Sequence, residues 1–181
     1  MIGVDIDPRE IDNLQRELGA TSKQVEQARR RAMTRTASTL RRTVNQELRS
    51  ALDVRTAAAL RRRLRPRGVK GGGRSSRTSI WIGMNNMALR DIKGRPRRAG
   101  GGMEVGGTRF ERAFQARMPT QSKRRVWQRR GSARLPIQEP TVPVQDEMQA
   151  AIDSRVMPEA SEIFMRHFMT DLRGRIARDR G

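Results

Sequence analysis

Residues 21–52 read TSKQVEQARRRAMTRTASTLRRTVNQELRSAL, the strongest periodic segment in the chain. From Val25 to Leu52 the apolar residues recur mostly three or four positions apart, which places them on one face of an α-helix. The leading Thr-Ser-Lys-Gln is a capping box, the sequence signature of a helix N-terminus. We therefore predict a helix of about 30 residues, about 45 Å long at 1.5 Å per residue.

A shorter helix is predicted before this one. Asp7-Pro8-Arg9-Glu10 supplies an N-cap Asp, a Pro at the first helical position and a Glu in the first turn. Gly19 is the residue type that ends a helix. Residues 1–7 alternate weakly between apolar and polar and predict a short strand.

The residues after the long helix predict short elements separated by basic loops. Asp53 is expected to cap a further short helix that runs to about Leu64. Strands are predicted at 78–84, 103–105, 110–118 and 126–130. Gly- and Arg-rich loops are predicted at 65–77 and 93–102.

The C-terminal third begins with three prolines between residues 135 and 144, which require an extended chain. From Val144 to about Ala177 the apolar residues again recur at helical spacing. Pro158 is expected to break or kink this helix near Met157.

The order of elements predicts an α+β fold, with a long N-terminal helix and a C-terminal helix packed on a small antiparallel sheet and with extended basic loops. A length of 181 residues suits one domain. We divide this domain, residues 1–181, into 1–64 with a strand and helices, 65–134 with short strands and Arg/Gly-rich loops, and 135–181 with the proline segment and the last helix.

Charge is the most unusual property of the composition. The chain has 39 Lys and Arg against 19 Asp and Glu, a net charge of +20, and 35 of the cations are arginines. Such a chain attracts polyanions, and guanidinium groups make bidentate contacts with both phosphate and carboxylate. The partner is therefore either nucleic acid or an acidic neighbouring subunit. Aromatic residues make up 3% of the chain, which disfavours a base-stacking platform.

Several classes of protein are excluded by what the sequence lacks. The absence of cysteine excludes a disulfide scaffold, a thiolate zinc site and a cysteine nucleophile. No apolar run approaches the ~18 residues that a membrane span needs, and the first residues do not resemble a secretory signal. We expect a protein made and used in the cytosol, without a membrane partner.

The residues that could carry catalysis are few. His167 is the only histidine, and its place beside Ile163 and Phe164 indicates a half-buried or surface residue more than a general base. Four carboxylates could bind a metal through oxygen; they are Glu139, Asp146, Glu147 and Asp153. The alternative is that Asp146 and Glu147 open the last helix and favour its dipole. We predict no enzyme, no cofactor and no metal.

Two glycine triplets, 71–73 and 100–102, lack the Gly-Lys-Ser/Thr ending of a phosphate loop. We interpret them as flexible hinges. Trp81 and Trp127 fall within predicted strands, where core packing is the expected role and stacking on a partner the alternative.

Three basic clusters are the candidate contact residues for a polyanion or an acidic protein, with solvated surface as the alternative. The first is Arg61, Arg62, Arg63, Arg65, Arg67, Lys70, Arg74 and Arg77; the second is Arg95, Arg97 and Arg98; the third is Lys123, Arg124, Arg125, Arg129, Arg130 and Arg134. The arginines at 29–31 and 41–42 are placed on the polar side of the long helix, where they keep it soluble or meet neighbouring subunits.

The pattern resembles the minor tail protein Z family of lambda-like phages and prophages, which are tail completion proteins. The resemblance covers roughly residues 10–176. It starts with the segment that contains Ile11, Leu14 and Leu18 and continues through the long helix around 28–37 and the basic segment 54–64. The matching stretches that follow are Arg109-Phe110-Glu111-Arg112-Ala113-Phe114, Trp127-Gln128-Arg129-Arg130-Gly131, Arg134-Leu135-Pro136-Ile137, Pro143-Val144 and the closing amphipathic helix. Its most specific part is the order of elements from Phe110 to Val144.

This resemblance implies a structural virion protein at the head-proximal end of a long non-contractile tail, assembled in the host cytoplasm. Its subunits would form a ring, expected to be a hexamer, that completes the tail and helps to join it to the head. Its partners would be the tail terminator, the tail tube and the neck or connector proteins, with phage DNA in the channel as a further contact. The alternative is a free, sequence-independent nucleic-acid-binding protein, and a nuclease or other enzyme is the third hypothesis.

Overall fold

The computed structural model describes residues 2–3, 7–70, 77–119 and 121–179; the side chains of residues 2, 3, 69, 70 and 77 are outside that description. The chain forms two compact units. Unit 1 comprises Met1–Glu47, Arg61–Gly83 and Ala150–Gly181, and unit 2 comprises Leu48–Leu60 and Met84–Gln149. The predicted α+β class is confirmed, with long helices and small antiparallel sheets. Each of the three predicted sections, 1–64, 65–134 and 135–181, contributes residues to both units.

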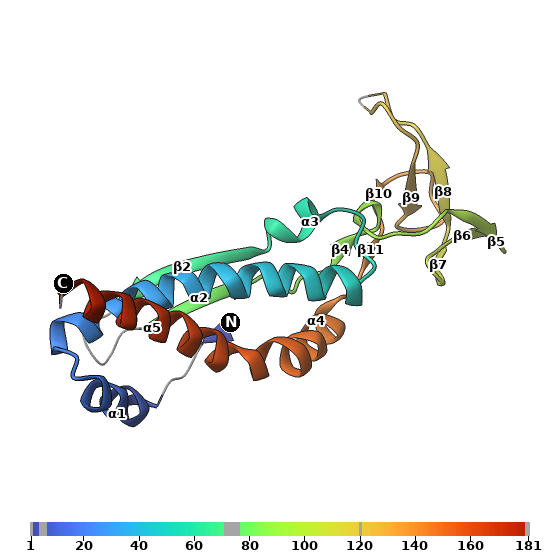
Figure 1. Ribbon diagram of the computed structural model, residues 1–181. Helices are drawn as coiled ribbons and strands as arrows, with labels where there is room; N and C mark the ends of the chain where they lie inside the picture. Colours follow the sequence, from blue (N-terminus) through green and yellow to red (C-terminus); the bar gives the residue numbers. More distant parts are fainter. Residues whose placement is uncertain (1, 4–6, 71–76, 120, 180–181) are drawn as a thin grey trace. The chain divides into compact units, whose positions relative to one another are not determined.

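The helices of unit 1 begin and end where local sequence signals predict (Figure 1). Helix α1 spans Pro8–Leu18; the side chain of Asp7 accepts a 2.9 Å hydrogen bond from the Arg9 N–H, and Gly19 ends the helix with φ of 62°. Helix α2 spans Ser22–Ala51. Its capping box is formed as predicted, because the Thr21 N–H donates to Gln24 Oε1 at 2.7 Å and the Gln24 N–H donates back to Thr21 Oγ1 at 3.3 Å.

The C-terminal helix is interrupted at the predicted place without ending there. Helix α4 (Gln145–Ala151) leads into a π turn (Ile152–Val156), and helix α5 spans Met157–Asp179. The Met157 N–H donates to the Ile152 carbonyl, five residues back. Pro158 has no N–H with which to continue an α-helical ladder, and a π turn is a known way to accommodate a local defect within a helix. The predicted interruption near Met157 is therefore a π turn.

The core of unit 1 joins its three main helices. Helix α5 contributes Phe164, Phe168 and Leu172, which are fully buried, and helix α2 contributes Ala28 and Ala32. The two phenylalanine rings stack with their centroids 5.9 Å apart. Alanines opposite large aromatics let two helices approach closely, so that large and small side chains fill the space together.

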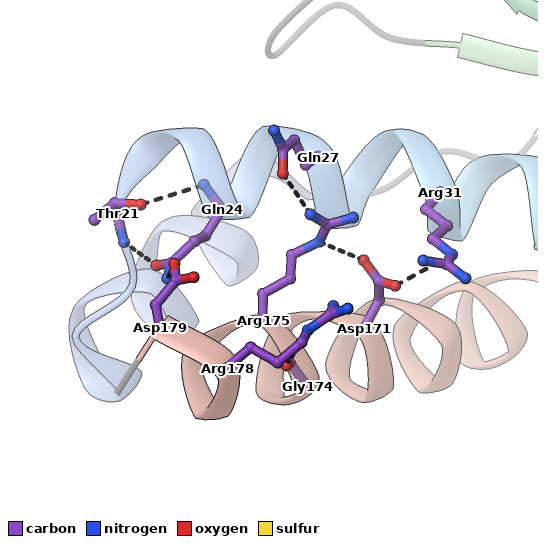
Figure 2. A network of polar contacts seen from close by, with 9 residues as sticks. All are labelled: Thr21, Gln24, Gln27, Arg31, Asp171, Gly174, Arg175, Arg178 and Asp179. Atoms are coloured by element: carbon purple, nitrogen blue, oxygen red, sulfur yellow. Dashed lines mark hydrogen bonds and ion pairs between the residues drawn. The ribbon is translucent and has the colours of Figure 1, made fainter. Parts of the chain in front are cut away.

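A buried carboxylate links the same two helices (Figure 2). The Asp171 side chain on α5 is 6% exposed, and its Oδ1 lies 3.4 Å from Arg31 Nε on α2. Its Oδ2 accepts a 2.7 Å hydrogen bond from Arg175 Nε, and Arg175 in turn donates to the Gln27 amide oxygen on α2. Asp171 therefore holds two guanidinium groups between the helices, and a buried charge of this kind is stable only while its partners remain.

We expect the Asp171→Asn substitution to lower the free energy of unfolding by about 2 kcal/mol, because it removes the charge from one charge-assisted hydrogen bond, with Arg175, and from one ion pair, with Arg31. Urea denaturation at pH 7 measures this change. The matched control is Glu162→Gln, an exposed carboxylate on the same helix, which should change stability by no more than about 0.5 kcal/mol. Equal effects of the two variants would show that Asp171 contributes no more than a surface charge.

The arginines of α2 do not all lie on its polar side. Arg31 contacts Asp171, whereas Arg29 is 7% exposed and lies beside Ile11 and Val25 in a groove lined by α1 and α2. The prediction that residues 29–31 lie on the polar side of the long helix is wrong for Arg29, because α1 folds over that part of α2.

Unit 1 also contains an antiparallel sheet of order β1-β3-β2, formed by β1 (Ile2–Gly3), β2 (Leu64–Lys70) and β3 (Arg77–Ile82). The first and third strands were predicted. The prediction of a loop from residue 65 is wrong as far as residue 70, because Pro66 pairs with Ile80 inside β2. Since β2 is an edge strand, a proline there need not remove a ladder hydrogen bond. Residues 71–76, with the first glycine triplet, lie outside the described residues.

Asp53 does not cap the short helix. It has φ of 47° in the turn that ends α2, and Val54 then forms a β-bridge with Ile92. Helix α3 begins only at Ala57 and ends at Arg61, short of the predicted Leu64. Asp53 adopts the left-handed backbone conformation, which Asp and Asn tolerate better than most other residues do.

Unit 2 consists of short antiparallel strands. One sheet has the order β5-β6-β7, from Arg97–Ala99, Gly102–Val105 and Thr108–Glu111, and another has the order β10-β9-β8, from Ile137–Gln138, Arg125–Arg129 and Ala113–Ala116. Strand β4 (Met87–Ala88) pairs with β11 (Thr141–Val142), and a 3₁₀ turn covers Leu89–Asp91. The core contains Leu89, Met103, Val105, Phe110, Ala113 and Val126.

Two predicted boundaries in unit 2 are wrong. The predicted loop 93–102 contains strand β5, and Gly100 and Gly101, with φ of 32° and 81°, form a tight turn into β6 and not a flexible hinge. The predicted strand 110–118 divides at Arg112, where φ is 56°. The proline segment is extended as predicted, with β10 and β11 within it. Among the described residues, no helix is both long enough and apolar enough to cross a membrane.

Candidate polyanion interface

The third basic cluster lines a hollow on unit 2 with a volume of about 330 Å³. Lys123, Arg124 and Arg125 come from the turn before β9 and from its first residue. Arg55 and Arg90 line the same hollow although they are far away in sequence. The pairing of Val54 with Ile92 brings these two arginines to one place.

The second basic cluster meets the third at a neighbouring hollow of about 670 Å³ in the same unit. Arg98 of β5 and Arg124 both line it, beside Phe114. Pro96, Gln115 and Arg124 belong to the linings of both hollows, so the two hollows adjoin. Two clusters that are 25 residues apart in sequence therefore form one basic surface, which we call the unit 2 basic site: Arg55, Arg90, Arg98, Lys123, Arg124 and Arg125.

Local contacts restrain some of these cations and leave others available. Arg90 forms an ion pair with Glu139, and Arg55 donates to the carbonyl oxygens of Ile92 and Gly94, each at 3.1 Å. Within the described part of the chain, the side chains of Lys123 and Arg124 form no ion pair or hydrogen bond, and both are exposed. The first hollow is lined by five cations and only two carboxylates, Asp91 and Glu139, so it favours an anionic ligand.

The remaining predicted residues of these clusters lie outside the unit 2 basic site. The Arg129 guanidinium lies over the Phe114 ring, 4.8 Å from its centroid, which is cation–π geometry. Arg97 is paired in register with Glu104 across β5 and β6. Arg95, Arg130 and Arg134 are exposed.

The first basic cluster belongs to unit 1. Arg61 and Arg62 are exposed at the end of α3, and Arg65 and Arg67 are exposed on β2. Arg63 is half-buried and donates to the Gly83 carbonyl oxygen at 3.3 Å. Lys70 and Arg77 pair in the β2–β3 ladder, while Arg74 lies outside the described residues.

Of the two tryptophans, Trp81 differs from its predicted role. Trp81 is 41% exposed, so the prediction of core packing is wrong for it. The register pairs Leu64 with Ile82 and Arg65 with Trp81, and strand alternation sends these pairs to opposite faces of the sheet. Trp127 is half-buried, and its Nε1 is buried without a hydrogen-bond partner among the described residues.

Sequence reasoning missed Arg55 and Arg90 at this site. Each stands alone, outside the charge runs, and only the long-range bridge between Val54 and Ile92 brings them together. No local sequence pattern indicates that Arg55 and Arg90 lie together, because the pairing of distant segments is set by the fold and not by neighbours in sequence.

The predicted carboxylate positions have ordinary structural roles. Asp146 and Glu147 lie in the first turn of α4, as expected of residues that favour the helix dipole. Glu139 pairs with Arg90, and Asp153 lies in the π turn. Within the described ranges, no group of three or more His, Asp or Glu side chains is arranged to hold a metal ion.

His167 is half-buried on α5, as predicted, and its Nε2 lies 3.1 Å from Thr39 Oγ1 on α2. Burial lowers its pKa below the ordinary 6.5, and the nearby charges of Arg35 and Arg166 lower the pKa further. The unfolded chain therefore binds a proton more readily than the folded chain. The stabilising contribution of neutral His167 is present above pH 6.5. It is lost as the pH falls from 6.5 toward the lowered pKa of His167 in the folded chain.

We expect unfolding measurements at pH 7.5 and pH 5.5 to show a smaller loss of stability in His167→Gln than in the parent chain. Glutamine can still hydrogen-bond Thr39, but it does not titrate. Because His167 is the only histidine, no other side chain has an ordinary pKa in this interval. An identical pH dependence in both proteins would contradict the role assigned to His167.

Comparison of the chain with protein-family models, with curated proteins and with solved structures found no match in any of the three.

Proposed function

We propose that this chain is a structural protein of a phage virion, a tail completion protein that forms a ring at the head-proximal end of the tail. The resemblance of residues 110–144 to the minor tail protein Z family supports this role. In this proposal the unit 2 basic site contacts either the DNA in the channel or acidic proteins of the neck, and the long helices provide surfaces for packing between subunits.

The observation that carries the proposal is the convergence of the second and third basic clusters on one face of unit 2. Arg98 and Arg124 lie at the same hollow, and Lys123 and Arg125 lie beside them. Guanidinium groups that contact only phosphates bind DNA irrespective of its base sequence. A protein surface that lines a DNA channel needs this kind of contact. The same groups match carboxylates on a neighbouring subunit.

Antibody–gold labelling of particles of the encoding phage or prophage, observed by negative-stain electron microscopy, tests the location. Label at the junction of head and tail is the expected result. Label absent from the particle, with the protein found only in the host lysate, would overturn the proposal and favour the free nucleic-acid-binding alternative.

We expect the double substitution Arg98→Ser and Arg124→Ser to weaken binding of duplex DNA by the purified chain. If each arginine contacts one phosphate, the slope of log affinity against log salt concentration should fall in magnitude by about 2. Fluorescence anisotropy of a labelled duplex between 50 and 200 mM salt measures both quantities.

The charge-matched control is Arg166→Ser with Arg173→Ser, two exposed positions on α5 in unit 1. This control should keep most of the salt dependence. Equal losses in both double variants would show that DNA responds to the net charge alone. Failure of the parent chain to bind DNA would leave acidic neck proteins as the partner of the unit 2 basic site.

A further inference from the structure

Unit 1 exposes one face of its β1-β3-β2 sheet. Trp81, on the central strand β3, is 41% exposed, and Arg65 and Arg67, on the edge strand β2, are exposed beside it. The alternate residues Ile80 and Ile82 are 2% and 6% exposed, so the opposite face belongs to the core. Among the described residues of unit 1, none covers the face of the sheet on which the tryptophan lies.

The charge of this region is all of one sign. Residues 61–83 include seven arginines and one lysine but no aspartate or glutamate. The Arg65 guanidinium carbon lies 6.0 Å from the centroid of the Trp81 ring, at the outer limit of a cation–π contact. Arg65 pairs with Trp81 across the ladder, and Arg67 pairs with Ser79. A large aromatic surface is thus bordered by cations without a carboxylate in the same segment.

We propose that this face is a docking surface for an acidic, extended segment of another protein, with Trp81 as the apolar anchor and Arg65 and Arg67 as the partners of its carboxylates. Tryptophan and arginine are the residues most enriched among those that dominate interface energies. Guanidinium groups flanking an aromatic anchor bind carboxylates in bidentate fashion while the ring buries apolar area.

Nucleic acid fits this face less well than an acidic protein. Single-stranded nucleic acid is held by successive aromatic side chains on which several bases stack. Trp81 is the only aromatic residue between positions 61 and 83, so the segment offers no second ring on which a further base could stack. One aromatic residue with flanking arginines is better suited to anchor a side chain of a partner protein than to stack several bases of a nucleic acid.

A second copy of this chain is also disfavoured as the occupant. The chain offers only one pair of adjacent carboxylates, Asp146-Glu147, and both residues lie in the first turn of α4. Because the chain carries a net charge of +20, two copies also repel one another, and an acidic segment of a different protein is the favoured occupant. The inference gives the first basic cluster a partner of its own and holds whether or not the chain is part of a virion.

Fluorescence of Trp81 tests the docking surface directly. In a Trp127→Phe background, Trp81 is the only tryptophan, and the probe is a 12-residue peptide of alternating Glu and Ala. We expect a saturable blue shift of the emission as the ring leaves water. Arg65→Ser with Arg67→Ser should weaken binding at least tenfold, while Arg124→Ser with Arg125→Ser in unit 2 should change it less than twofold.

Three outcomes would overturn the inference: no shift at saturating peptide, equal weakening by the two charge-matched pairs, or a shift with a 12-nucleotide oligothymidylate but none with the peptide. Circular dichroism checks that each variant is folded. If Trp127→Phe is unstable, anisotropy of labelled peptide with Trp81→Ala in the otherwise unchanged chain replaces the fluorescence assay, with a tenfold loss expected. Because these assays use the isolated chain, their failure is distinguishable from a failure of particle labelling.

Discussion

Replacing Gly102 with alanine should lower the free energy of unfolding by about 3 kcal/mol or more, the upper end of the cost of overpacking a well-packed site. Gly102 opens β6 and pairs with Glu111 of β7. A Cβ at this position would lie against the Phe110 carbonyl oxygen, far inside van der Waals contact, and 3.1 Å from Glu111 Cα. These are backbone atoms of the neighbouring strand, so β6 and β7 must separate to admit the methyl group.

The measurement is denaturant unfolding in a Trp81→Phe background, followed by the fluorescence of Trp127, which belongs to unit 2. Gly131→Ala is the matched control, because a Cβ there meets no atom within 4 Å and the backbone is not left-handed. The control should change stability by no more than about 0.5 kcal/mol. A Gly102 variant as stable as the control would mean that β6 and β7 do not approach as closely as the structure shows.

Local signals account for the parts of the fold that the sequence predicts well. Asp7, Gly19 and the Thr21 capping box act within a single helical turn, and each occurs at the boundary it predicts. Strand β2 was missed because Pro66 indicates a break when taken alone. Its tolerance depends on β2 being an edge strand, which is a property of sheet order and not of the neighbouring residues.

The faces on which strand side chains lie are even harder to predict from local sequence. Trp81 was assigned to the core on its residue type, yet the face it occupies depends on strand register, and a shift of one residue reverses every assignment in a strand. Likewise, the clusters at 95–98 and 123–125 are visible as charge runs. Their convergence depends on which hairpins adjoin, so Arg55 and Arg90 could not be added to the site from sequence.

Cooperativity between the two units bears on the prediction of a single domain over residues 1–181. The chain crosses between the units four times, and α2 is one continuous helix that includes residues of both. A chain threaded in this way is expected to unfold in one transition, because neither unit is a single uninterrupted segment. Trp81 and Trp127 lie in different units and therefore report on each separately.

Phe164→Ala should destabilise the protein by about 4 kcal/mol, from the lost transfer free energy and the cavity that remains. Phe164 is fully buried and stacks on Phe168 in the core shared by the helices of unit 1. Met157→Ala, which truncates a residue 38% exposed on the same helix, is the control and should cost about 0.5 kcal/mol or less.

Single-tryptophan versions of the Phe164→Ala protein add the decisive comparison. If residues 1–181 unfold as one domain, the denaturation midpoints reported by Trp81 and by Trp127 should move together, although the cavity lies in unit 1 alone. A shift seen only by Trp81 would contradict the single domain while leaving the core assignment intact. A stability unchanged from that of the Met157 control would contradict the core assignment itself, because a fully buried phenylalanine cannot be removed from a close-packed interior without loss of contacts.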